Sequence, residues 1–259
     1  MTVSIGIAGL GAIGNAVAKA LIEGIHNLEL TAISDIKADI DIGVPNVSFD
    51  ELAQKCDMII ECLPPQTVPD LAKAVFAQDK DLMLISSSAL LLYPEIMSLH
   101  KGSKGRIIVP SGALIGLDGV SALKNLGIHS AKIASTKPPL GFSGAPHIVK
   151  NNIDLTSIKE KTCLFRGNAY EAAAGFPANV NVAATLALAS IGPAAVEVEV
   201  WADPDIKGNR HEISVESEFS QMQASVQNRP DPANPKTSVL AAQSIIAVLK
   251  GMHEPFVVI

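Results

Sequence analysis

The sequence predicts an α/β fold in two parts, a doubly wound parallel sheet followed by a second α+β domain. Three observations predict it. Apolar strand-like segments alternate with helix-period segments over the first 110 residues, and the first such strand runs into a Gly-x-Gly-x-x-Gly turn. After residue 113 the segments lengthen, mix polar with apolar residues and are joined by proline-rich connections. Strict alternation implies right-handed crossovers and a parallel sheet.

The first strand and its glycine turn predict a dinucleotide site. Residues 3–8 are apolar and rich in β-branched side chains, as in a buried parallel strand. Gly9 allows a sharp turn, Gly11 lets a pyrophosphate approach the backbone, and Gly14 lets the next helix pack on the strand. The N–H groups at that helix start bind an anion. The predicted cofactor contacts here are Gly9, Gly11, Ala12, Ile13 and Gly14.

An acidic residue in the expected place supports NAD as the cofactor. The second strand, 28–33, leads to Asp35, which lies 21 positions after Gly14. A carboxylate at this point accepts hydrogen bonds from the adenosine ribose hydroxyls. Lys37 is close enough to a 2′-phosphate that NADP use stays open. The turn, helix, strand and acid together indicate a Rossmann domain.

The rest of the first domain continues the alternation. We expect helices at 50–55 (capped by Asp50), 66–78 and 93–100, and strands at 58–63, 82–85 and 106–109. Ligands bind beyond the carboxyl ends of such strands, so Leu63 and Pro64 are expected to contact the cofactor. The serines at 86–88 either line the cofactor channel or serve only as turn residues.

The second half predicts a mixed or antiparallel sheet with helices. Strands are expected at 128–136, 164–167, 196–202, 209–218 and 220–227, and helices at 118–126, 169–174, 179–191 and 237–250. The last helix is apolar enough to return to the first domain. We therefore expect a dinucleotide-binding domain of residues 1–112 plus 236–259, and a substrate, catalytic and dimerisation domain of residues 113–235.

Composition excludes several classes of partner. The net charge is −6 and no lysine or arginine cluster occurs, so neither nucleic acid nor an anionic membrane is expected to bind. No apolar run approaches the roughly 20 residues of a membrane span, and no secretory signal precedes the first strand. Three scattered cysteines predict reduced thiols and no metal site. These features favour the cytoplasm.

Among six histidines, His211 is the best candidate for acid–base chemistry. It lies in a predicted strand, where residues two apart share a face, so Asn209 points the same way. An amide beside an imidazole can orient a water or fix the tautomer. On the pattern alone a structural histidine is the more common outcome.

Several uncommon strings give the chain an end-to-end resemblance to the aspartate dehydrogenase family. They are Pro110-Ser111-Gly112-Ala113, Lys137-Pro138-Pro139, Phe176-Pro177-Ala178-Asn179-Val180-Asn181, Ala202-Asp203-Pro204, Asn209-Arg210-His211-Glu212-Ile213 and Asn234-Pro235-Lys236-Thr237-Ser238. The resemblance implies NAD(P)-dependent oxidative deamination of L-aspartate, through iminoaspartate, to oxaloacetate and ammonia. In some members of the family the imine feeds pyridine nucleotide biosynthesis.

The resemblance also implies roles for individual residues. The family's catalytic histidine falls on His211, and its cofactor-contacting alanine and asparagine fall on Ala113 and Asn181. The two substrate carboxylates need neutralising, and the candidates are Lys137, Arg210, Lys236 and Thr237, with backbone N–H groups near Gly112. Asn209 is a further expected substrate contact. An unperturbed histidine, with a pKa near 6.5, would accept a proton at neutral pH. We expect a homodimer, for which an apolar second-domain sheet would be a suitable interface.

Two other functions stay open at this point. One is a related reductase of the dihydrodipicolinate type, although the histidine pair with basic neighbours that marks that family is missing here. The other is a non-catalytic dinucleotide sensor on the same fold. The loop at 86–88 carries serine where more glycine is expected in relatives, and the Cys62-Leu63-Pro64-Pro65 string is bulkier than the small residues expected at that strand end. These departures leave the exact amino acid open.

Overall fold

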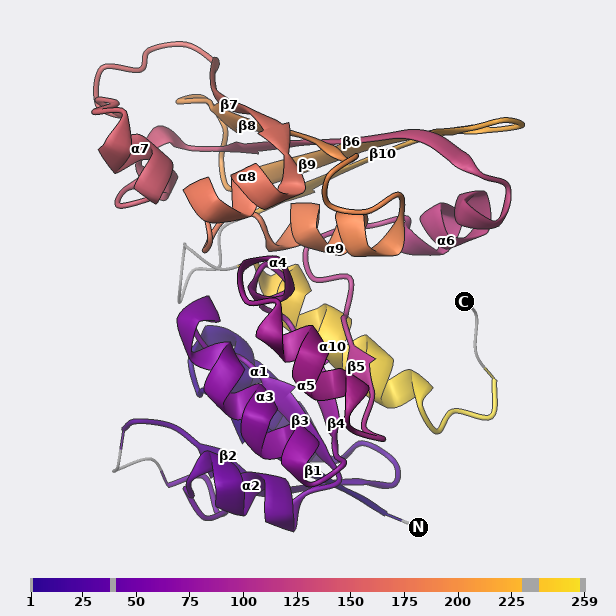
Figure 1. Cartoon of the computed structure of the whole chain (residues 1–259). Coiled ribbons are helices and arrows are strands. Elements are labelled where there is room, and N and C mark those ends of the chain that lie inside the picture. Colours follow the sequence, from indigo (N-terminus) through magenta and orange to yellow (C-terminus); the bar gives the residue numbers. More distant parts are fainter. Residues whose placement is uncertain (1, 38–40, 230–237, 257–259) are drawn as a thin grey trace. The chain divides into compact units, whose positions relative to one another are not determined.

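The chain folds into two compact units, each with its own five-stranded sheet (Figure 1). The computed structural model describes residues 2–37, 41–229 and 238–256. Unit 1 comprises Met1–Gly112 and Ala241–Ile259, and unit 2 comprises Ala113–Leu240. Each unit therefore contains a sheet together with helices. The predicted α/β class with a second, mixed sheet is confirmed.

Unit 1 contains a parallel sheet with strand order β2-β1-β3-β4-β5. Its strands are β1 (Val3–Ala8), β2 (Leu28–Ser34), β3 (Met58–Glu61), β4 (Asp81–Leu84) and β5 (Ile107–Ile108). Its helices are α1 (Ala12–Gly24), α2 (Phe49–Lys55), η1 (Pro65–Thr67), α3 (Val68–Ala77), α4 (Ala89–Leu92), α5 (Glu95–Lys101) and α10 (Val239–Gly251). The β2-β1-β3 order places the strand crossover beside β1, where an open parallel sheet binds its ligand.

Alternation along β1 divides the core between two helical layers. Ile5 and Ile7 are fully buried in one cluster with side chains of α1 and α10, including Ile245. Gly6 faces the opposite way. A Cβ there would lie 2.9 Å from a methyl carbon of Leu52, which shows that this face packs on α2. Helices thus cover both faces of the sheet, which is the doubly wound arrangement.

Unit 2 contains a mixed sheet with strand order β10-β9-β6-β8-β7. Its strands are β6 (Ile128–Lys137), β7 (Thr162–Asn168), β8 (Glu197–Ala202), β9 (Asn209–Ser217) and β10 (Gln221–Asn228). Its helices are α6 (Leu117–Asn125), η2 (Pro139–Phe142), α7 (Pro146–Lys150), α8 (Ala169–Gly175) and α9 (Asn181–Ala189). Only β6 and β8 pair in parallel within this sheet; the other pairs are antiparallel.

The helices of unit 2 gather on one face of its sheet. Figure 1 shows α6, α8 and α9 along the same side of the strands. Odd-numbered residues of β9, such as His211, Ile213 and Val215, are buried on that side. No described helix of unit 2 covers the opposite face, which we call the open face. Charged and polar side chains of the central strands occupy it.

Several predicted boundaries are wrong for identifiable reasons. Asp50 does not cap α2: the cap is Ser48, whose hydroxyl accepts from the Glu51 N–H while the Glu51 carboxylate accepts from Ser48 N–H. The helix expected at 93–100 is present as α5 but begins two residues later, because Pro94 keeps Tyr93 out of the helical region, and the short α4 before it was not predicted. The helix expected at 66–78 likewise begins as the short η1 turn.

Other elements differ in length. Only two residues of β5 pair, and α9 starts two residues later than expected. Helix α7 was not predicted at all, because five residues carry no clear period.

Among the described residues, no helix is long and apolar enough to cross a membrane.

Candidate active site

The glycine turn is fixed by close contacts with the chain itself at two of its three glycines. Gly9 has a φ of +91°, and a Cβ there would lie 2.5 Å from the Cys62 carbonyl oxygen. A Cβ at Gly14 would overlap the Gly9 carbonyl oxygen. Both positions therefore require glycine for backbone conformation or packing alone.

Gly11 is different, because no part of the protein requires it to be glycine. Its φ is −71°, which any residue adopts, and a Cβ there would meet nothing within 4 Å. The space left by the missing side chain lies beside the N-terminus of α1, which has no side-chain cap. The residues present thus fit a dinucleotide, whose pyrophosphate would take up that space and the helix N–H groups.

Asp35 lies directly beside this turn. Its Oδ2 accepts from the Leu10 N–H at 2.6 Å and its Oδ1 from the Lys37 N–H at 2.9 Å. The Asn46 side chain holds the backbone on either side, accepting from Asp35 N–H at 2.9 Å and donating to Lys37 O at 3.1 Å. The carboxylate is therefore oriented before a ribose arrives, and it is half-buried at the end of β2.

The carboxyl ends of β3 and β4 are joined through Glu61, which sequence reasoning missed. This carboxylate is fully buried and accepts from the N–H groups of Leu63 and Ser86. Leu63 itself packs on the glycine turn, with Cδ2 3.0 Å from where a Gly9 Cβ would be. Pro64 follows as the residue before η1, and Ser86, Ser87 and Ser88 are all buried.

In unit 2, His211 faces a serine across two antiparallel strands. Ser135 on β6 pairs with His211 on β9, and Ser135 Oγ lies 2.9 Å from Nδ1 of the imidazole. Both residues are buried. For Nε2 to be the nitrogen that accepts a proton, Nδ1 must carry the hydrogen and donate it to Ser135 Oγ. Burial first, and the charge of Lys137 second, lower the pKa of His211 to about 3.

Lys137 lies two residues further along β6, on the same side of the strand as Ser135. Its Nζ donates to Asn179 Oδ1 at 3.0 Å, and burial lowers its pKa to about 8. Among the described residues, no carboxylate lies within 4 Å of this ammonium. A half-buried cation with only an amide partner leaves room for an anionic ligand.

The other predicted residues lie in several places. Asn209 begins β9, and its buried Oδ1 accepts no hydrogen bond from any described residue. Asn181 is the first residue of α9 rather than its cap, and Ala113 is a buried residue directly after Gly112. Arg210 points to the open face, donating to Gln227 at 3.1 Å. Lys236 and Thr237 lie outside the described residues.

Ser135 and Asn179 were not singled out from the sequence. Ser135 is one small polar residue in a strand of mixed character, and only the β6–β9 register brings it to His211. Asn179 precedes α9 and reaches Lys137 across 42 positions of sequence. Such pairings depend on tertiary packing, so no local sequence pattern predicts them.

The fold and the nucleotide turn define the class of protein: the chain is an NAD(P)-dependent oxidoreductase with a Rossmann domain. A family model described as "NADP oxidoreductase coenzyme F420-dependent" matches residues 4–90, and one described as "Aspartate dehydrogenase, C-terminal" matches residues 118–252. The second match covers just over half of the chain and includes His211, Ser135 and Lys137.

Relatives of full length carry the same description. The chain is 40% identical to L-aspartate dehydrogenase 3 of Bordetella bronchiseptica, over 97% of this chain and 95% of that one. It is 40% identical to the L-aspartate dehydrogenase of Methanococcoides burtonii, over 97% of both. The crystal structure of aspartate dehydrogenase from Thermotoga maritima superposes with a TM-score of 0.75, at 26% identity and 100% coverage of both chains. The chain therefore belongs to the L-aspartate dehydrogenase family.

The contrast between Gly11 and Gly14 makes a prediction about cofactor binding. Gly11→Val should leave the melting temperature nearly unchanged, because the fold has room for the side chain. It should weaken NAD binding by about two orders of magnitude, because the side chain occupies the pyrophosphate space. Calorimetric titration and thermal melts measure the two effects. Gly14→Ala is the matched variant, and it should lose stability; unchanged NAD affinity in Gly11→Val would contradict the assignment.

Proposed function

We propose that the protein oxidises the amine of L-aspartate with NAD(P)⁺ and releases ammonia, in a reversible reaction. Aspartate, NAD(P)⁺ and water give oxaloacetate, ammonium, NAD(P)H and one proton, with iminoaspartate as the intermediate. The proposal depends on two side chains on the same face of the unit 2 sheet. One is the buried His211 imidazole, held by Ser135, and the other is the Lys137 ammonium, which has no carboxylate partner among the described residues. Family membership supports the same substrate.

The chemistry needs a base on the substrate nitrogen. Hydride leaves the α-carbon only when the amine is neutral, because the nitrogen lone pair forms the C=N bond. Bound NAD(P)⁺ supplies the hydride acceptor. We assign His211 as the proton acceptor for the amine. Once that proton has passed to solvent, His211 accepts a second proton from the water that attacks the imine and returns it to the departing nitrogen. Ser135 at Nδ1 keeps the imidazole in one orientation for both transfers.

The substrate carboxylates need cations or N–H donors, and Lys137 is the main candidate on this face. Its ammonium is charged below a pKa of about 8. Asn179 accepts one of its three hydrogens and leaves two for the substrate. Asn209, whose Oδ1 is buried without a donor, is proposed to accept from the substrate amine or the attacking water.

We propose that substrate binding also raises the pKa of His211, which is low in the free enzyme. The sequence led us to expect an ordinary histidine, but the structure buries it beside a cation and lowers its pKa to about 3. A substrate carboxylate on Lys137 would cancel that cation and add negative charge near the ring. Both changes raise the pKa of the imidazole towards the range of a useful base.

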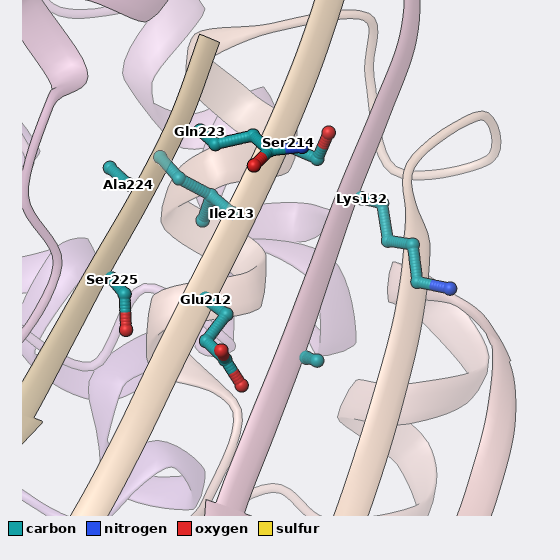
Figure 2. Close-up of a pocket in the computed structure, with 8 residues that line it drawn as sticks. Lys132, Glu212, Ile213, Ser214, Gln223, Ala224 and Ser225 are labelled. Carbon is teal, nitrogen blue, oxygen red and sulfur yellow. The ribbon is translucent and has the colours of Figure 1, made fainter.

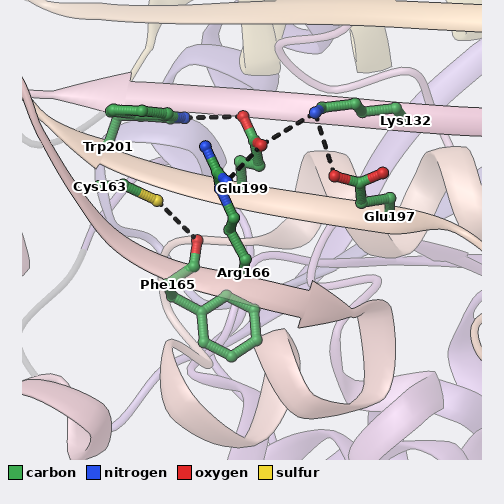
Figure 3. Close-up of polar contacts among 7 residues, drawn as sticks. All are labelled: Lys132, Cys163, Phe165, Arg166, Glu197, Glu199 and Trp201. Atoms are coloured by element: carbon green, nitrogen blue, oxygen red, sulfur yellow. Dashed lines mark hydrogen bonds and ion pairs between the residues drawn. The ribbon is translucent and has the colours of Figure 1, made fainter.

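We further propose a homodimer that uses the open face of the unit 2 sheet. The expectation of an apolar interface is wrong for this face, which is polar. Figure 3 shows Lys132 bonded to Glu197 and Glu199, and Arg166 and the Trp201 indole also bonded to Glu199. Beside them is a hollow of about 360 Å³ on β6, β9 and β10, lined in part by Glu212 and Ser225 (Figure 2).

The centre of this network is well packed, although no described helix of unit 2 covers this face. Glu199 is 7% exposed, and the Trp201 ring is flanked by the cationic groups of Lys161 and Arg166 at 5.2 and 5.6 Å. Charges that are already paired can be covered by a second copy with less desolvation cost than free ones.

Three free cysteines fit a reducing compartment, which supports the cytoplasm as the location.

The reaction is tested by a panel of amino acids and 2-oxo acids with both nicotinamide cofactors. We expect L-aspartate and oxaloacetate to give the highest kcat/KM. His211→Asn should lower kcat by about 10²- to 10⁴-fold while NAD binding is kept, since the imidazole is the proton acceptor. His129→Asn, an exposed histidine of the same unit, is the control. No turnover with any amino acid would favour a sensor, and reduction of a cyclic imine alone would favour the dihydrodipicolinate-type alternative.

The charge of Lys137 predicts how a substrate analogue binds as pH changes. Succinate has two carboxylates and no amine, so its inhibition constant reports carboxylate binding alone. Because Lys137 is cationic below its pKa of about 8 and neutral above it, inhibition should be level at about pH 6.5 to 7, where succinate is still a dianion. Above pH 8 it should weaken about tenfold per pH unit.

Lys137→Met should bind succinate weakly at every pH and lose this dependence. Lys124→Met, at an exposed lysine on α6, should behave as the unaltered enzyme does. A succinate profile that stays the same in Lys137→Met would rule out the proposed carboxylate contact.

The dimer is tested by light scattering with size-exclusion chromatography at micromolar concentration. The unaltered chain should have the mass of two copies. Glu212→Lys on the open face should shift the population towards one copy, because it reverses a charge in the hollow. Glu160→Lys, in an exposed loop, should not. A single-copy mass for the unaltered chain would refute the proposal.

A further inference from the structure

Glu61 lies at an unusual position for an acidic residue. It is the last residue of β3, in register with Ala8 of β1 and Leu84 of β4, and it is 0% exposed. Strands on both sides and helical layers above and below exclude water from it. A carboxyl group in the middle of a parallel sheet is costly unless every oxygen has a partner.

Its partners come from two different loops and include main-chain N–H groups of both. Oε1 accepts from the Leu63 N–H at 2.6 Å, and Oε2 accepts from the Ser86 N–H at 2.9 Å. The loop after β4 returns a bond to the loop after β3, since Ser86 Oγ donates to Leu63 O at 2.9 Å. Among the described residues, no lysine, arginine or histidine forms an ion pair with Glu61. Its contacts therefore fix backbone position and do not balance a charge.

The loop after β3 in turn seats the glycine turn. The Cys62 N–H donates to Ala8 O at 2.8 Å, immediately before the turn. The Cys62 carbonyl oxygen and Leu63 Cδ2 lie 2.5 and 3.0 Å from where a Gly9 Cβ would be. A shift of this loop towards or away from the sheet therefore moves the turn that faces the pyrophosphate.

We propose that Glu61 is a positioning residue for the dinucleotide: its buried carboxylate clamps the loops after β3 and β4, and so holds the glycine turn in its binding geometry. The proposal rests on NAD(P) binding and does not depend on which amino acid is oxidised. Glutamine has the same shape but replaces one acceptor oxygen with an NH₂ group, which would face an N–H donor. One of the two loops would then lose its bond.

The test compares two carboxylates at opposite ends of the same strand. Glu61→Gln should raise the Kd and KM for NAD about tenfold, as loss of a supporting hydrogen bond does, while kcat at saturating NAD changes less than about twofold. Asp57→Asn is the matched control. Asp57 precedes β3 and accepts from Ser4 N–H and Oγ, so the variant should lose stability without losing NAD affinity.

Two measurements separate positioning from a purely structural role. If Glu61→Gln melts at a lower temperature but the folded enzyme binds NAD as before, the proposal is wrong. If the variant does not fold, amide exchange in the unaltered chain decides: NAD should slow exchange at Leu63 and Ser86 more than at Asp57. Equal rates with and without NAD would overturn the proposal.

Discussion

The close approach of Gly9 to the Cys62 carbonyl oxygen determines the geometry of the nucleotide half of this protein. A φ of +91° and a Cβ position only 2.5 Å from that oxygen leave no alternative to glycine. The turn is thereby pressed against the loop after β3, and α1 starts at a fixed point relative to the sheet. Gly11, which the protein does not constrain, is then free to accommodate a ligand. Gly9 is therefore required by the fold itself, whereas a glycine at position 11 would be required only for ligand binding.

The parts of the fold that depend on local pattern were predictable. The β1 run, the glycine turn and the period of α1 are properties of consecutive residues, so their positions follow from the sequence to within a residue or two. His211 could be singled out because it sits in a strand beside Asn209 and in a string typical of the family. Asp35 followed from its spacing after Gly14.

Residues that act through tertiary pairing could not be found in this way. Ser135 meets His211 only because β6 and β9 pair in one particular register, and Glu61 reaches Ser86 across 25 positions. The helix expected at 93–100 starts two residues late, at Glu95, because the steric effect of Pro94 keeps Tyr93 out of it. The basicity of His211 depends on burial and on Lys137, neither of which the sequence displays.

The position of Lys137 beside His211 has a consequence for selectivity. In the free enzyme burial is the main cause of the low pKa of the ring and the Lys137 ammonium adds to it, so an anion on the lysine would remove the smaller of the two suppressing effects. An amino acid without a side-chain carboxylate, such as alanine, would leave at least part of that suppression in place even when it binds. Discrimination between dicarboxylic and neutral amino acids would then be expressed in the rate of the chemical step more than in occupancy.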